Sequence, residues 1–251
     1  MMEAFFFGPA GEQLFAAYHP PASAGGRSLT VICPPLFSEY MRSQLALREL
    51  AIALAASGQH VVRFDYRGTG DSFGELSEVA LEDWLEDIRL ALREGMELSG
   101  SDQVRVVGVR AGALLACRAV GAAEEIRSVV LWDPVRDGAE YLQALRRVQR
   151  AILHRNRALS SADRRGALLE HGGYRLPGPM VDEFLRLDAA AYGQVPAHKL
   201  HVVSTAHPAD FVVPGATAHT ACFDCEWEAP NEDQLLPQPV LEKLTQCITL
   251  S

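Results

Sequence analysis

One stretch near the middle of the chain decides the fold. It reads Gln103-Val104-Arg105-Val106-Val107-Gly108-Val109-Arg110-Ala111-Gly112-Ala113-Leu114-Leu115-Ala116. The β-branched run at its start predicts a buried strand, the Gly-x-x-x-Gly segment from Gly108 to Gly112 predicts a tight turn, and the alanine- and leucine-rich run that follows predicts a helix. So short a turn between strand and helix lifts its central residue, Arg110, above the end of the sheet.

The segments around this stretch alternate between strand and helix patterns. Strands are predicted at residues 29–33, 60–65, 128–132, 199–204 and 217–223, and helices at 41–57, 81–98 and 239–248, after an N-terminal hairpin of residues 5–7 and 13–18. A strand followed by a helix and another strand indicates a parallel crossover unit. We therefore expect an α/β chain with a mostly parallel central sheet and helices on both faces.

Residues 138–196 differ from this alternation. Their periodicity is helical and more polar, which is typical of an inserted helical cap. We expect one core domain, made of residues 1–137 and 197–251, that carries this cap. At 251 residues, of which 48% are hydrophobic, the chain is long enough for one sizeable domain of this kind.

Composition and charge argue against several functional classes. A net charge of −9 disfavours nucleic-acid binding, which needs clustered lysine and arginine. No apolar run approaches the roughly 20 residues that cross a bilayer, and the first residues lack the basic region of a signal peptide, so we expect a cytoplasmic protein without a membrane span. The five cysteines favour reduced thiols. Cys222-x-x-Cys225 has no second pair at zinc-site spacing, so we expect no metal, and we expect no cofactor.

Four segments carry a family resemblance that spans nearly the whole chain. The run Val62–Ser72 is similar to the strand-and-loop signature of serine-aminopeptidase-like and acyl-hydrolase members of the α/β-hydrolase superfamily. The runs Pro34–Tyr40, Gly108–Leu115 and Leu131–Gly138 resemble, more narrowly, the hydrolases associated with bacterial exosortase and exopolysaccharide loci. The resemblance implies the α/β-hydrolase fold and a catalytic triad in the chain order Ser, Asp or Glu, His.

The nucleophile of that triad is missing. In the superfamily the turn reads Gly-x-Ser-x-Gly, whereas Arg110 stands at the central position here. A guanidinium is neither a nucleophile nor a base at any physiological pH. Three interpretations remain open: Arg110 reaches solvent or a neighbouring carboxylate at a site that has lost its function, it clamps a carboxylate or phosphate in a pocket, or it acts as an electrophile.

The acid and the histidine are also uncertain. Asp210 fits the slot that the resemblance assigns to the acid, and Asp133, at the end of the preceding strand, is a second candidate. The base should follow the last strand, but no histidine occurs from residue 220 to residue 251. His207 lies on the loop of Asp210, and His219 lies within the last predicted strand, so each serves as a base only if it swings into the site.

The oxyanion hole consists of backbone amides and survives substitution of side chains. The resemblance assigns it to the N–H of Ala111 and to that of Leu36 or Phe37. Together with Arg110, these donors would bring positive potential to one spot and bind an anion. The cap adds a basic patch that would steer an anionic ligand or an acidic partner, formed by Arg146, Arg147, Arg150, Arg155 and Arg157.

These observations favour a protein with a degenerate triad that binds rather than cleaves. We expect an accessory protein with an anion or acyl pocket. The resemblance implies that it acts in bacterial exopolysaccharide or surface-protein processing. The alternative is a working esterase, thioesterase or acyltransferase that uses His207 or His219 and a nucleophile such as Ser38 or Cys33. A third hypothesis is a subunit that supports a homologous active partner, so a protein partner or a homo-oligomer is also considered.

Overall fold

The sheet has the topology that the alternating pattern predicts. The computed structural model describes residues 2–23, 28–155, 170–205, 211–223, 225–229 and 233–250. Their strands form one sheet in the order β1-β2-β4-β3-β5-β6-β7-β8. These strands are β1 (Glu3–Phe7), β2 (Leu14–His19), β3 (Leu29–Cys33), β4 (His60–Phe64), β5 (Val104–Val109), β6 (Ile126–Trp132), β7 (Leu200–Ser204) and β8 (Thr217–Thr220). All neighbours from β4 to β8 pair in parallel, and the β1–β2 hairpin adds an antiparallel edge beside β4.

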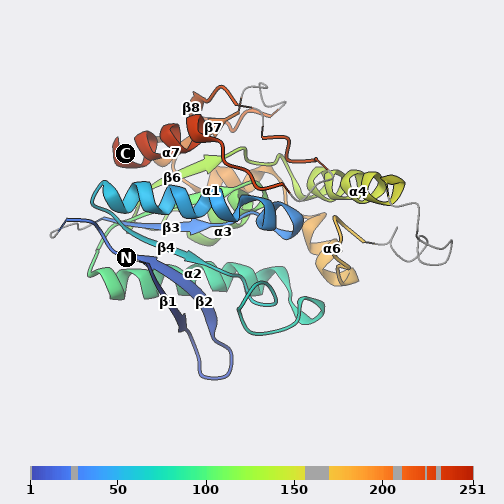
Figure 1. The fold of residues 1–251 in the computed structure, drawn as a ribbon, viewed down its shortest axis with the longest axis horizontal. Helices are drawn as coiled ribbons and strands as arrows, with labels where there is room; N and C mark the ends of the chain where they lie inside the picture. Colours follow the sequence, from blue (N-terminus) through green and yellow to red (C-terminus); the bar gives the residue numbers. More distant parts are fainter. Residues whose placement is uncertain are drawn as a thin grey trace.

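Helices cover both faces of this sheet. They are α1 (Phe37–Ala56), α2 (Leu81–Ser99), α3 (Ala111–Val120), α4 (Gly138–Arg155), α6 (Gly178–Phe184) and α7 (Gln238–Leu250), with short 3-10 turns at Leu76–Glu78, Ala189–Gln194 and Ala197–Lys199. α1 and α7 share one apolar core with one face of the sheet, and α2 and α3 share another core with the opposite face (Figure 1). Because alternate side chains of β5 enter the two cores, the elbow strand is buried on both sides.

α1 and β8 differ slightly from their predicted bounds. α1 begins at Phe37 rather than at residue 41, and its N-cap residue, Leu36, makes no side-chain capping bond. A helix start without Ser, Thr, Asp or Asn at the cap carries no local signal in the sequence. β8 ends at Thr220, before the predicted residue 223.

The cap is packed into the same core as the α2 and α3 layer. α4 and α6 lie beyond the carboxyl ends of the parallel strands (Figure 1). Their apolar residues Tyr141, Met180 and Phe184 belong to the core that contains Trp84. Aromatic rings meet there, since the Phe37 ring lies 6.1 Å from that of Phe184 and 6.0 Å from that of Trp84. The cap therefore packs directly on the first residue of α1.

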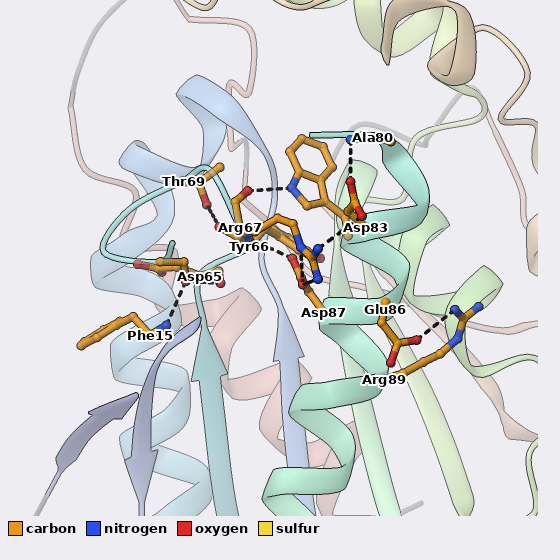
Figure 2. A network of polar contacts seen from close by, with 12 residues as sticks. Phe15, Asp65, Tyr66, Arg67, Thr69, Ala80, Asp83, Glu86, Asp87 and Arg89 are labelled. Carbon is orange, nitrogen blue, oxygen red and sulfur yellow. Dashed lines mark hydrogen bonds and ion pairs between the residues drawn. The ribbon is translucent and has the colours of Figure 1, made fainter. Parts of the chain in front are cut away.

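The Val62–Ser72 signature holds the loop after β4 against α2. Figure 2 shows the Arg67 side chain between Asp83 and Asp87 of α2, with Arg67 Nη2 2.7 Å from Asp87 Oδ1 and Arg67 Nη1 3.2 Å from Asp83 Oδ1. Trp84 Nε1 donates a hydrogen bond to the Arg67 carbonyl. Burial raises the pKa of the Asp87 carboxyl, and Arg67 opposes that shift. In the structure this signature therefore positions a loop.

No helix among the described residues is both long and apolar enough to cross a membrane.

A buried histidine in β2 predicts a pH-dependent stability. His19 is 4% exposed, and burial, followed by the nearby Arg63 guanidinium, lowers its pKa to about 4. The unfolded chain takes up this proton near pH 6.5, so the stability that neutral His19 contributes is lost as pH falls from about 6.5 towards 4. We expect a loss of up to about 3 kcal/mol over that range. Urea denaturation of His19→Gln at pH 7, 5 and 4 should show a smaller loss of the free energy of unfolding with falling pH. The same substitution at the exposed His154 should leave the pH dependence as in the wild type. An equal pH dependence in wild type and His19→Gln would contradict the prediction.

Candidate active site at the β5 elbow

The turn between β5 and α3 keeps the geometry of a nucleophile elbow although its central residue is arginine. Arg110 has φ 53° and ψ −123°, a conformation that non-glycine residues rarely adopt. Both glycines of the motif are needed for close packing. A Cβ on Gly108 would lie 2.7 Å from the Cα of Ala113, and a Cβ on Gly112 would lie 2.2 Å from the carbonyl oxygen of Pro34. The elbow is thus pressed against the loop that leads into α1.

The Arg110 side chain points to a carboxylate. Its Nε donates to Glu39 Oε1 at 3.1 Å, its Nη1 donates to the Asp133 carbonyl at 3.1 Å, and 14% of the side chain is exposed. The structure thus shows Arg110 in contact with a neighbouring carboxylate, as the first of the three interpretations expects of its side chain, and whether the site has lost its function stays a prediction. Glu39, in the first turn of α1, is 3% exposed, and the sequence analysis did not single it out.

Burial and mutual attraction oppose each other in this ion pair. Burial alone would lower the pKa of the Arg110 guanidinium, but the Glu39 and Asp133 carboxylates offset it, and that pKa is raised. Burial raises the pKa of the Glu39 carboxyl, and Arg110 counteracts the rise. Among the described residues, Glu39 Oε2 is buried without a hydrogen-bond partner. The positive charge of Arg110 is therefore compensated inside the protein.

A tryptophan lies where the resemblance places the histidine. Trp227 follows the last strand, and its ring centroid is 5.3 Å from the Arg110 Cζ. Its indole Nε1 donates to Asp133 Oδ2 at 2.8 Å, while Asp133 Oδ1 accepts from the Thr205 amide at 2.8 Å. Trp227 thus contacts Arg110 on one side and Asp133 on the other, which is the order of contacts among the nucleophile, base and acid of a triad. An indole N–H only donates and cannot take a proton from a nucleophile.

Two arginines hold the Trp227 loop in place. Arg42 of α1 is 5% exposed and its Nη1 donates to the carbonyls of Glu226 and Trp227 at 2.9 and 3.0 Å. Arg147 of α4 makes a two-pronged bond to Glu228, with both N···O distances at 2.7 Å. Both partners of that second contact are largely exposed. The cap and α1 therefore both keep Trp227 over Arg110.

Two arginines of the predicted basic patch on the cap make contacts within the protein. Arg147 pairs with Glu228, and Arg146 Nε donates to His171 Nε2 at 2.9 Å. Arg157 lies outside the described residues. A patch that steers an anionic ligand stays a prediction.

Two of the residues predicted to form the oxyanion hole, Leu36 and Phe37, line a small cavity, and Ala111 is not among its lining residues. Ala111, Leu36 and Phe37 are 1%, 2% and 3% exposed, and the Leu36 carbonyl accepts a hydrogen bond from the Tyr141 hydroxyl. Phe37 has φ 56°. A cavity of about 170 Å³ adjoins this loop, lined by Pro34, Pro35, Leu36, Phe37, Tyr40, Met41, Tyr66, Gly68, Thr69, Gly70 and Tyr174. Its walls are mainly apolar and aromatic.

The other sequence candidates lie elsewhere or outside the described residues. Asp210 and His207 belong to the part of the chain that the structure does not describe. His219 lies on β8, three strands from β5 in the sheet order, and its ring stacks on His201 at 5.8 Å. Cys33 is fully buried, and burial raises the pKa of its thiol. Ser38 faces the cap, because a Cβ on Gly172 would lie 2.8 Å from its Oγ.

Metal ligands do not gather in the part of the chain that the structure covers. No group of three or more His, Cys, Asp or Glu side chains there could hold a metal ion. Of the Cys222-x-x-Cys225 pair, Cys222 is exposed and Cys225 is buried.

Comparison with protein families identifies this architecture. A family model described as serine aminopeptidase, S33 matches residues 37–166, which is more than half of the chain and includes the elbow. The chain belongs to the serine aminopeptidase S33 family. This family lies within the α/β-hydrolase superfamily, as the Val62–Ser72 segment and the observed sheet indicate. Among curated proteins, a sequence search finds no significant match.

Solved structures confirm the α/β-hydrolase fold of this S33 family member. Est1E from Butyrivibrio proteoclasticus, solved with ferulic acid bound, is 18% identical to this chain. The match covers 98% of each of the two chains and has a TM-score of 0.63. A thioesterase domain from the curacin biosynthetic pathway is 15% identical, covering 100% of this chain and 98% of its own with a TM-score of 0.59. An α/β serine hydrolase homologue from Coxiella burnetii is 23% identical, and the match covers 53% of this chain and 62% of that one with a TM-score of 0.45. The chain thus spans less than two thirds of the Coxiella protein.

Proposed function

We propose that this S33 family member is a non-hydrolytic protein that binds a small acyl ligand beside the elbow and serves an accessory role. One observation carries the proposal. Arg110 at the elbow is held in an ion pair with Glu39, and Trp227 rather than a histidine donates to Asp133. Acyl transfer needs a nucleophile and a base that takes its proton. Neither an arginine nor an indole supplies those functions.

The cavity beside Phe37 favours an acyl group over a free anion. Glu39 compensates the charge of Arg110, so the guanidinium offers little net attraction to a second carboxylate. The lining residues are mainly apolar, and the cavity of about 170 Å³ is smaller than the 300 Å³ or more of typical drug-sized sites. A short acyl chain or a small ring matches this volume and polarity.

The resemblance to exosortase-associated hydrolases supplies a setting for the proposal. It rests on the runs Pro34–Tyr40, Gly108–Leu115 and Leu131–Gly138. In that setting the protein would bind an acylated component, or an enzyme that acts on one, during bacterial exopolysaccharide or surface-protein processing.

Fluorophosphonate labelling tests the absence of an activated nucleophile. We expect no adduct by intact-mass measurement on the wild type, and none on Arg110→Ser, because a serine without a base stays unreactive. The double variant Arg110→Ser, Trp227→His places a serine and a histidine in line with Asp133. We expect the fluorophosphonate to form a measurable adduct with this variant, and we expect that adduct to disappear when Asp133→Asn is added.

A known serine hydrolase serves as the positive control for the reagent. A wild-type adduct would overturn the proposal, and peptide mapping would then name the nucleophile. Binding is tested separately by thermal shift with a panel of short-chain acyl amides, which should raise the melting temperature. A panel without any stabilising member would contradict the acyl pocket.

A further inference from the structure

A groove runs along the outer side of α1, away from the elbow. On β2, Phe15, Ala17 and His19 face this helix, and Arg63 of β4 stands beside Ala17 in the strand pairing. We call the space between these residues and α1 the hairpin groove. Two cavities fill it, of about 450 Å³ and about 530 Å³, and Met2 lines both. Each volume lies within the range of small-molecule sites.

The cavity beside Arg63 has mostly apolar walls. Beside Arg63, the cavity of about 450 Å³ is lined by Met2, Phe15, Ala17, Ile32, Pro34, Tyr40, Met41, Gln44, Leu47, Phe64, Asp65, Gly70 and Asp71. Met2 and Met41 are 47% and 57% exposed, so two flexible apolar side chains stand at its rim. Methionine adapts its shape to a ligand more readily than branched side chains do.

Arg63 brings a positive charge into this space, and the Asp65 carboxylate of the same cavity attracts it from beyond ion-pair distance. Within the described residues, no carboxylate lies within ion-pair distance of its guanidinium. Its recorded contacts are long ones, from Nε to His19 Nε2 at 3.4 Å and from Nη2 to Met2 Sδ at 3.9 Å. Burial lowers the pKa of the guanidinium, which nevertheless stays charged at neutral pH. The fold thus leaves most of the five N–H donors of Arg63 available to a ligand.

The charged groups around Arg63 favour a ligand with one negative charge over a ligand with two. Asp65 is engaged, since its carboxylate accepts from the Tyr40 hydroxyl and from the Asp71 amide. His19 is neutral at pH 7, because its pKa is lowered to about 4. Asp65 and Asp71 in the same cavity repel a doubly charged phosphate about twice as strongly as a singly charged carboxylate. A planar carboxylate also matches the guanidinium with two parallel hydrogen bonds.

We propose that the hairpin groove binds a monocarboxylate with an apolar body, with its carboxylate on Arg63 and its hydrocarbon part between Met2, Phe15 and Met41. This site goes beyond the acyl pocket at the elbow. The two cavities share Pro34, Tyr40, Met41 and Gly70, whereas Met2, Phe15 and Arg63 line the hairpin groove and not the acyl cavity.

Methyl NMR with octanoate tests the site directly. In the full chain labelled at the methionine methyl groups, octanoate is expected to shift the signals of Met2 and Met41, assigned by leucine substitutions. The signals of Met96 in α2 and Met180 in the cap should stay in place. Octanamide, which keeps the chain but lacks the charge, should bind at least tenfold more weakly. A shift of Met41 without a shift of Met2 would place the ligand in the acyl cavity, and shifts confined to Met180 would place it at the cap. Either result would overturn the proposal.

Variants separate the charge from the cavity. Arg63→Met keeps the length of the side chain and should weaken octanoate at least tenfold, whereas Arg118→Met, on the exposed side of α3, should leave the affinity unchanged. Gln44→Trp fills the cavity from α1 and should abolish binding while the melting curve confirms folding. Equal octanoate affinity in wild type and Arg63→Met, or no octanoate shift of Met2 and Met41 in the wild type, would overturn the proposal.

Discussion

Replacing Glu39 with glutamine is expected to cost about 3 kcal/mol or more of the free energy of unfolding. The amide has nearly the same shape, but it leaves the buried Arg110 guanidinium without its nearest counter-charge. Removing one partner of a buried ion pair typically costs 3–5 kcal/mol, because the remaining charge stays desolvated. Arginine cannot escape by releasing its proton. Urea denaturation at pH 7 measures the loss.

The reverse substitution supplies the matched control. Arg110→Met leaves Glu39 alone, but a carboxylate can take up a proton, so the loss should be smaller than in Glu39→Gln. With Arg110 absent, burial raises the pKa of Glu39 further above its unfolded value, so the variant should gain stability as pH falls from 7 towards 5. The double variant Glu39→Leu, Arg110→Met should be more stable than Glu39→Gln. Equal losses for both single variants, without any pH difference, would show that the pair is not a buried ion pair.

The second large effect is expected at the elbow itself. In Gly112→Ala the new Cβ would lie 2.2 Å from the Pro34 carbonyl oxygen and 2.9 Å from that of Cys33. Both neighbours are backbone atoms, so the contact is relieved only if the elbow separates from the loop before α1. Overpacking of this kind costs about 1–3 kcal/mol and occasionally more. A Cβ only 2.2 Å from a carbonyl oxygen puts the cost at the upper end of that range. Alanine is about 1 kcal/mol better than glycine in a helix and offsets part of it, so we expect a net loss of about 2 kcal/mol.

Gly193→Ala is the control for this prediction. No atom lies within 4 Å of a Cβ at that position, and its backbone does not adopt a positive φ. Its effect should stay within about 0.5 kcal/mol, as expected for a surface substitution. Thermal and urea denaturation of both variants measure the difference, and a Gly112→Ala protein as stable as Gly193→Ala would contradict the close packing at the elbow.

The sequence predicted much of the site but not its contacts. The elbow was visible because Gly108 and Gly112 flank Arg110 between a strand pattern and a helix pattern. The missing histidine was visible because none follows His219. Glu39 gave no signal, since one acid in the first turn of a helix is common and its partner is 71 residues away. Trp227 gives no signal in the sequence either, since its partner Asp133 lies 94 residues before it.

The sequence by itself determined the alternation of strands and helices, the sharp turn at Arg110 and the presence of arginine rather than serine at its centre, because these depend on residue types at local spacings. Only the tertiary structure decided that Arg110 is neutralised by Glu39 and covered by Trp227. Those contacts exist because β3 lies between β4 and β5 and β6 lies beside β5, which brings the loops at their carboxyl ends together. Sheet order depends on packing over the whole domain, and no short stretch of sequence carries it.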